Sequence, residues 1–237
     1  GEALTKHLSK ILPALLTSLS EKMGTPDEQE ELEYCQSVVL SVNDEVGVRV
    51  IMDELLAATT KDQAGLRCAA VTILHSYCEL TKADYSEYVP QLFRGLLHLF
   101  TDTDERVLHA AWDCLNAVIK KLDGSDLLAN VTNMRQALRF AVSDLKQELL
   151  PGFCLPKKGI APIWQIFREA ILNGPPELKE SAAIGLGEVI KRTSPEALKP
   201  SVVGITGPLI RILGDRFSFN VKVAVLETLG LLLGKCG

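Results

Sequence analysis

The stretch VLHAAWDCLNAVIKKL, residues 107–122, decides the fold class of this chain of 237 residues. Its apolar side chains recur three and four positions apart, at Val107, Ala110, Ala111, Cys114, Leu115, Val118, Ile119 and Leu122. That spacing places them along one face of an α-helix, the face that packs against a core. The preceding TDTDE, residues 101–105, supplies side chains that form turns and cap helices. The stretch therefore predicts an amphipathic helix.

A second stretch with helical spacing comes just before the first one. YSEYVPQLFRGLLHLF, residues 85–100, carries apolar side chains at Val89, Phe93, Leu96, Leu97 and Phe100. Two such helices joined by a short turn form a helical hairpin. No part of the sequence alternates apolar and polar residues between hairpin turns, so we predict no β-strands.

A pair of small or apolar residues recurs in the second helix of successive hairpins, as Ala69-Ala70, Ala110-Ala111, Ala182-Ala183 and Ala224-Val225. The first members of these pairs are 41, 72 and 42 residues apart. Two of these steps match the period of about 40 residues that HEAT and armadillo arrays share, and two helices per repeat favour HEAT. We therefore predict an all-α fold, a HEAT-repeat α-solenoid of about five to six helical hairpins.

Prolines are also expected early in the first helices, at Pro13, Pro90, Pro162 and Pro208. In the first turn of a helix the missing N–H of proline is tolerated, whereas further along it kinks the helix.

The step of 72 residues predicts one irregular repeat with an inserted loop. The additional residues hold a helix, expected over about Leu127 to Leu145, and the segment KQELLPGFCLPKKG, residues 146–159. The prolines and glycines of this segment cannot continue a helix, so we expect a loop. Such insertions often lie on the binding face of a solenoid, and a solvated connector is the alternative.

These features divide the sequence into three parts. We expect about three HEAT repeats over 1–122, the irregular repeat over 123–159 and about two repeats over 160–237. The last helix is still apolar where the sequence stops, which predicts that the array continues in a longer protein.

Composition excludes several classes of protein. The net charge of −5 gives no global attraction to DNA, RNA or an anionic membrane, although a local basic patch remains compatible with it. No apolar run approaches the roughly 18 residues that span a bilayer. The six cysteines form no C-x-x-C pair and lie mostly in apolar helical runs, which favours a reducing compartment.

The glycine-rich stretch GITGPLIRILGDRF, residues 204–217, has the wrong spacing for a nucleotide site. Its glycines, Gly204, Gly207 and Gly214, match neither the dinucleotide nor the P-loop pattern, and no strand precedes them. We instead predict a first helix with Pro208 near its start and Gly214 near its C-terminal end. Asp215 then opens the turn to the next helix.

No metal, cofactor or catalytic site is predicted either. Cys68, His75 and Cys78 share one helical face, but the two cysteines lie about 15 Å apart along a helix, too far for one zinc ion. His7, His98 and His109 have no suitably spaced partners. The motifs of serine hydrolases and zinc proteases are absent, so we predict that the chain is not an enzyme.

The basic residues at two corners between helices are candidates for protein binding. Arg211, Arg216 and Lys222 surround one corner, and Lys191, Arg192 and Lys199 surround the preceding one. Arginine offers a planar fork of donors that suits carboxylates on a partner. We predict that the binding residues are Arg211, Arg216, Lys222 and Arg192. A surface arginine that contributes little is the alternative.

Several stretches resemble the large HEAT-repeat activators of the amino-acid-starvation kinase, which phosphorylates the alpha subunit of translation initiation factor two. PGFCLPKKG, TSPEALKPSVVGITGPLIRILGDRFS and VKVAVLETLGLLL look like the C-terminal third of these proteins. KADYSEYVPQL and AAWDCLNAVIKKLD are similar as well, so the resemblance covers most of the chain.

The resemblance implies a scaffold that is cytoplasmic and associated with polysomes, and that uses no cofactor. In this family the region is implicated in binding the RWD domain of the eIF2-alpha kinase, for which other RWD-domain proteins compete. The family is reported to rely on an arginine in this region, and the resemblance points first to Arg211 and second to Arg216. More N-terminal regions of the family contact ribosomes. If the binding surface needs later repeats, this chain holds only part of it.

Two further classes stay open. A karyopherin-like adaptor or a phosphatase scaffold would also be a HEAT protein, but Trp112 and Trp164 form no recurrent Trp–Asn ladder. Direct contact with ribosomal RNA through PKKG, residues 156–159, would depend strongly on salt.

Overall fold

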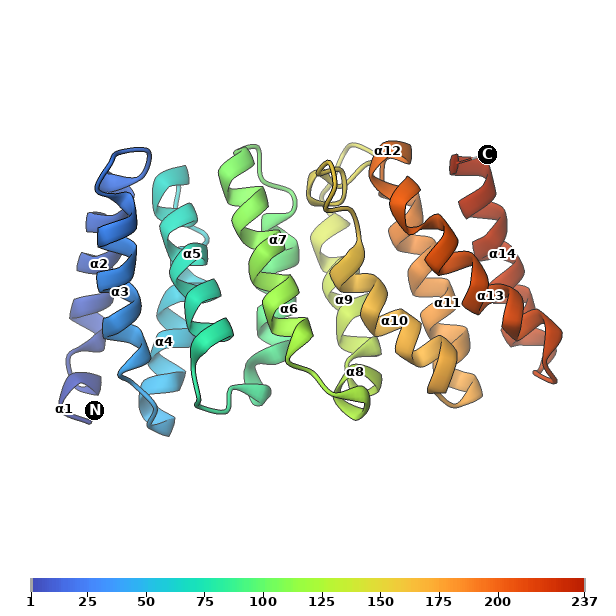
Figure 1. The fold of residues 1–237 in the computed structure, drawn as a ribbon, viewed down its shortest axis with the longest axis horizontal. Helices are drawn as coiled ribbons and strands as arrows, with labels where there is room; N and C mark the ends of the chain where they lie inside the picture. The colour runs from blue at the N-terminus through green and yellow to red at the C-terminus, as the bar shows by residue number, and fades with distance from the viewer. Residues whose placement is uncertain (1, 237) are drawn as a thin grey trace. The chain divides into compact units, whose positions relative to one another are not determined.

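The computed structural model describes residues 2–236, and over these residues it contains helices and turns but no strand (Figure 1). The helices follow one another as antiparallel hairpins, which confirms the predicted all-α fold of HEAT type. Contacts between residues divide the chain into two compact units, residues 1–118 and 119–237. We call them the first and the second unit and describe each by itself.

The first unit packs its helices around a continuous apolar core. Leu12, Leu19, Ile51, Leu55 and Tyr77 are completely buried in it. The helices are α1 (Glu2–Thr5), α2 (Leu8–Lys22), α3 (Glu28–Leu40), α4 (Glu45–Ala58), α5 (Ala64–Leu80), α6 (Val89–Leu99) and α7 (Glu105–Lys120), with a 3₁₀ turn, η1 (Ser86–Tyr88), before α6.

Helix α7 begins where the sequence predicts it. The carboxylate of Asp104 accepts hydrogen bonds from the backbone N–H groups of Arg106 and Val107, at 2.9 and 3.2 Å, and so caps the first turn. Ala111 of α7 and the pair Ala69-Ala70 of α5 are completely buried. These small side chains allow neighbouring helices to approach closely.

The second unit holds the irregular repeat and the last two hairpins. Its helices are α8 (Gly124–Ala129), α9 (Val131–Val142), α10 (Ala161–Asn173), α11 (Pro176–Lys191), α12 (Pro195–Leu198), α13 (Val202–Gly214) and α14 (Phe219–Cys236), with 3₁₀ turns η2 (Pro151–Phe153) and η3 (Lys199–Ser201).

The expected single helix over about Leu127 to Leu145 is wrong, because the structure has two shorter helices there. A capping box between Asp123 and Asp126 starts α8 early. The side-chain amide of Asn130 then donates to the backbone oxygen of Asp126 at 2.8 Å. Asparagine competes in this way with the helical backbone, and the helix breaks at Asn130 before α9 begins.

The segment 146–159 is a loop, as predicted, and it is firmly packed. Leu150 and Phe153 are completely buried, and Leu150 N–H donates to the backbone oxygen of Arg192 at 2.9 Å. The loop is therefore an ordered part of the second unit.

Two of the four prolines lie deeper in their helices than expected. Pro90 and Pro162 occupy the first turns of α6 and α10, but Pro13 and Pro208 lie inside α2 and α13. Pro208 removes one hydrogen bond to the carbonyl four residues earlier, which belongs to Gly204. Since Gly204 has no side chain and lies exposed, its backbone can adjust to the proline ring.

Candidate functional site

The corner between α13 and α14 is the site that the sequence favours. Helix α13 ends at Gly214, and Asp215 follows in an extended conformation with its N–H on the backbone oxygen of Ile212. Phe217 N–H then donates to the oxygen of Asp215 at 3.2 Å, and α14 begins at Phe219. GITGPLIRILGDRF is therefore a helix and its corner. The prediction that this helix starts close to Pro208 is wrong, since α13 begins six residues earlier.

The cations of this corner differ in their exposure. Arg211, in the last turn of α13, and Arg216, in the corner itself, are exposed, whereas Lys222 in the first turn of α14 is half-buried. Asp215 supplies one carboxylate between the two arginines in the sequence. The corner thus presents two guanidinium groups on one short segment, an arrangement suited to a partner that carries carboxylates.

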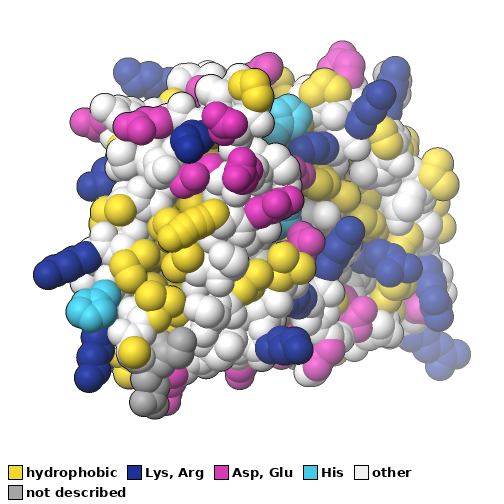
Figure 2. Space-filling view, turned by 60° about the vertical axis from the view of Figure 1, so that its left-hand side comes forward, with side chains coloured by type: hydrophobic (Ala, Val, Ile, Leu, Met, Phe, Trp, Pro, Cys, Tyr) yellow, Lys and Arg dark blue, Asp and Glu magenta, His cyan; other side chains and the backbone are white. Residues whose placement is uncertain are grey.

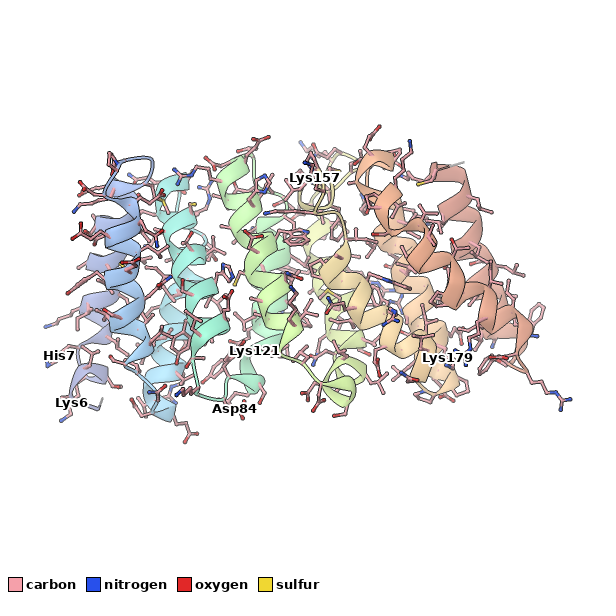
Figure 3. The ribbon with its side chains drawn as sticks, viewed as in Figure 1. Lys6, His7, Asp84, Lys121, Lys157 and Lys179 are labelled. Atoms are coloured by element: carbon pink, nitrogen blue, oxygen red, sulfur yellow. The ribbon has the colours of Figure 1, made fainter. Side chains whose placement is uncertain are left out.

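A buried lysine of α11 supports this corner from below, and sequence reasoning missed it. Lys179 is only 6% exposed, and its Nζ donates to the backbone oxygen of Ile171 at 2.7 Å (Figure 3). The same ammonium group lies 5.1 Å from the centroid of the Phe217 ring, within the range of a cation–π interaction. Burial lowers the pKa of Lys179; the carboxylate of Asp215 opposes this shift, and the charge of Arg211 adds to it.

Arg192 lies away from the other predicted binding residues. It caps the C-terminal end of α11 and donates through one guanidinium nitrogen to the backbone oxygens of Gln147 and Glu148, at 3.4 and 3.1 Å. Helix α13, with 13 residues and a length of about 20 Å, separates this end of the unit from the corner (Figure 1). The structure therefore brings Arg211, Arg216 and Lys222 together and leaves Arg192 apart. Its role in protein binding stays a prediction.

A groove of about 450 Å³ lies in the first unit, between α3, α5 and α7. Its apolar floor includes Leu19 and Cys68, and its rim carries Glu28, Arg106 and His109. Arg106 binds Glu28 at 2.6 Å across the groove. In Figure 2, which turns this unit towards the viewer, acidic side chains gather on its upper part.

The residues weighed as metal ligands do not form a site. His75 lines the groove and pairs with Glu79 at 2.7 Å, while Cys78 is completely buried in the core. Over the described residues no three His, Cys, Asp or Glu side chains gather as metal ligands. The six cysteines are all free thiols, and burial raises the pKa of Cys35 to about 11, which keeps that thiol protonated.

Comparison with known proteins gives a consistent result along the chain. The family model described as "Stalled ribosome sensor GCN1-like, HEAT repeats" matches residues 1–157. The chain is 54% identical over 237 residues to proteins from mouse and human named "Stalled ribosome sensor GCN1". It is 30% identical over 239 residues to a yeast protein named "eIF-2-alpha kinase activator GCN1". Each match covers essentially all of this chain and 9% of the relative, so the chain spans about a tenth of their length.

Among solved structures, an engineered protein aligns with a TM-score of 0.30 and 15% sequence identity over 92% of this chain. In residues 2–236 there is also no helix with the length and hydropathy that crossing a bilayer requires.

Proposed function

Because this chain belongs to the family of GCN1-like HEAT-repeat proteins, we propose that it is a scaffold segment that docks the RWD domain of the eIF2-alpha kinase. Two kinds of name support the role: relatives are called sensors of stalled ribosomes and activators of that kinase. The segment acts in the cytoplasm, on polysomes, during amino-acid starvation. Other RWD-domain proteins compete for the same surface.

The observation that carries the proposal is the α13–α14 corner. Arg211 and Arg216 are exposed there, in a chain whose net charge is −5. Lys179 lies over the Phe217 ring, and this contact ties the short segment between the helices to α11. Two guanidinium groups on a short segment whose backbone is tied to α11 need less ordering when they meet carboxylates, which favours binding.

The chain contributes surface and geometry to this role, and no chemical step. The kinase supplies the catalysis, and the HEAT array holds the RWD domain near the ribosome. A docking surface of this kind is expected to depend on salt, because the exposed arginines steer and hold an acidic partner.

The test is a titration of the purified RWD domain into this chain at two salt concentrations. Arg211→Glu and Arg216→Glu are measured beside Arg168→Glu, which reverses an exposed arginine of α10 in the same unit. We expect each corner reversal to weaken binding by tenfold or more and the control to leave it unchanged, with equal helical circular dichroism throughout. Unchanged affinity in both corner variants would remove the corner from the docking surface.

A further inference from the structure

The second unit carries a group of cations at the end that lies opposite the α13–α14 corner. Three segments form it, residues 146–159, 191–201 and Lys235 near the end of α14, and we call it the loop-end surface. Together these segments hold two acids, Glu148 and Glu196, and seven cations, Lys146, Lys157, Lys158, Lys191, Arg192, Lys199 and Lys235. A local excess of five positive charges stands out in a chain of net charge −5.

Backbone contacts hold the three segments together. Arg192 donates to the carbonyl oxygens of Gln147 and Glu148, and its own carbonyl oxygen accepts from Leu150 N–H. Lys235 Nζ lies 3.3 Å from the backbone oxygen of Lys191. These contacts join the start of the loop, the end of α11 and the end of α14.

The loop also meets α12 closely at its far end. At Gly159, a Cβ atom would lie 2.6 Å from the backbone oxygen of Ala197, so the close approach of loop and α12 requires glycine there. This contact holds the end of the loop, two residues after Lys157, against α12, and Lys199 directly follows α12. Figure 3 shows Lys157 at this end of the unit and Lys179 at the other.

The loop presents its lysines from a fixed backbone. Lys157 adopts a φ of 66°, in the left-handed region that side chains other than glycine rarely occupy, and it is exposed. Such a conformation persists where the surrounding structure imposes it. Leu150 and Phe153 are completely buried and anchor the loop in the core.

Helix capping accounts for only part of this charge. Lys191, Arg192 and Lys235 lie at the C-terminal ends of α11 and α14, where cations complement the helix dipole. The exposed Lys146, Lys157 and Lys199 lie in the loop and in η3 and cap no long helix. They are available for an external anion.

The composition of the surface indicates which anion it fits. Six of its seven cations are lysines, a residue that protein interfaces avoid and that phosphate-binding surfaces use freely. Contacts to the sugar–phosphate backbone come mainly from Lys and Arg and require no reading of bases. We propose that the loop-end surface binds the phosphate backbone of RNA. This goes beyond RWD docking, because it gives the segment a second partner at the other end of α13.

The experiment measures binding of this chain to a short end-labelled RNA duplex by fluorescence anisotropy at about 50 and 200 mM salt. The site variant combines Lys157→Glu with Lys199→Glu, and the control combines Lys6→Glu with Lys10→Glu, two exposed lysines of the first unit. Both variants change the net charge by the same amount. We expect the native affinity to fall about tenfold or more between the two salt concentrations. We expect the site variant to lose a further tenfold and the control less than twofold.

Three results would overturn the proposal: no RNA binding by the native chain, equal losses in the two variants, or competition by poly-glutamate as strong as that of unlabelled RNA. The last would identify an acidic protein as the occupant. Lys157→Gln with Lys199→Gln replaces the site variant if charge reversal disturbs folding. The RWD titration is repeated with the site variant, so that failure at one surface is distinguished from failure at the other.

Discussion

The ammonium nitrogen of Lys179 lies 5.1 Å from the centroid of the Phe217 ring and 2.7 Å from the backbone oxygen of Ile171. One buried side chain thereby joins three places: the end of α10, the first turn of α11 and the corner between α13 and α14. Ile171 stands in the last turn of α10, so the ammonium also meets the negative end of that helix. The conformation of the corner between α13 and α14 thus depends on a charged side chain that is buried.

Replacing Lys179 with methionine tests this charge through the pH dependence of stability. The pKa of Lys179 is lowered in the folded protein, so between that pKa and the ordinary value near 10.5 the unfolded chain binds more protons. The contribution of this group therefore increases the free energy of unfolding as pH rises through that window. Denaturant titrations at neutral and alkaline pH should show this gain in the native chain and not in Lys179→Met.

The same variant has a matched control in Lys6→Met, which removes an exposed ammonium group. That control should keep the pH dependence of the native chain. Hydrogen exchange gives a second readout, because the N–H of Phe217 should exchange faster in Lys179→Met than in the control. Equal exchange in the two variants would show that Phe217 does not need the lysine.

Two glycines should respond in opposite ways to the same substitution. In α11 a Cβ on Gly185 would lie 2.9 Å from both Cγ of Arg135 and Cζ of Phe167, so Gly185→Ala forces a shift in a packed layer. We expect a loss of roughly 1–3 kcal/mol in the free energy of unfolding. In α13 nothing lies within 4 Å of a Cβ on Gly207, and Gly207→Ala should gain up to about 1 kcal/mol through helix propensity.

Thermal and denaturant unfolding of both variants against the native chain would check this pair. A stabilising Gly185→Ala would mean that α9 and α11 can move apart at no cost, and that their close packing contributes little.

The repeat pattern was predictable because burial in a HEAT hairpin follows a simple periodicity. Val107, Cys114 and Val118 recur at helical spacing, and all are completely buried. The break at Asn130 was not predictable from periodicity, since the apolar pattern continues through it and only a side-chain hydrogen bond interrupts the helix.

The candidate site shows the same division. Arg211 and Arg216 could be placed at a corner, because Gly214 and Asp215 mark the end of a helix. Lys179 could not be recognised as buried from the sequence. It lies between Glu177 and Glu180 in a helix, a setting in which lysine is normally solvated. Its neighbours Ile171 and Phe217 come from α10 and from the corner between α13 and α14, so only the tertiary structure brings them together.

Glu188 of α11 joins α9 through two ion pairs, one with Arg135 and one, at 3.3 Å, with the more exposed Arg139. Arg135 donates to a single Glu188 oxygen at 2.7 and 3.1 Å and to the Ser181 hydroxyl at 3.0 Å. Its side chain is 15% exposed and that of Glu188 is 29% exposed, so solvent screens the pair only in part. We expect Arg135→Met to lower the free energy of unfolding by about 1–3 kcal/mol.

An exposed pair provides the comparison. Arg106 and Glu28 lie 2.6 Å apart, but their side chains are 53% and 38% exposed, and Arg106→Met should cost less than about 1 kcal/mol. Denaturant titrations at low and high salt would separate the two. If Arg135→Met lowered the free energy of unfolding no more than Arg106→Met, the ion pair of Arg135 would not be what holds α9 against α11.

Arg192 should stabilise the loop of residues 146–159 and should not contact the RWD domain. Its guanidinium group donates to Gln147 and Glu148 of the loop, and its carbonyl oxygen holds Leu150 N–H. Because Arg192→Gln removes only the side-chain bonds, the loop should become more sensitive to limited proteolysis near Lys146, while Leu150 and Phe153 keep it attached to the core. The RWD affinity of this variant should equal that of the native chain, because Arg192 and the corner lie at opposite ends of α13. A loss of affinity as large as that of Arg211→Glu would instead place Arg192 on the docking surface. That surface would then extend along the whole length of α13.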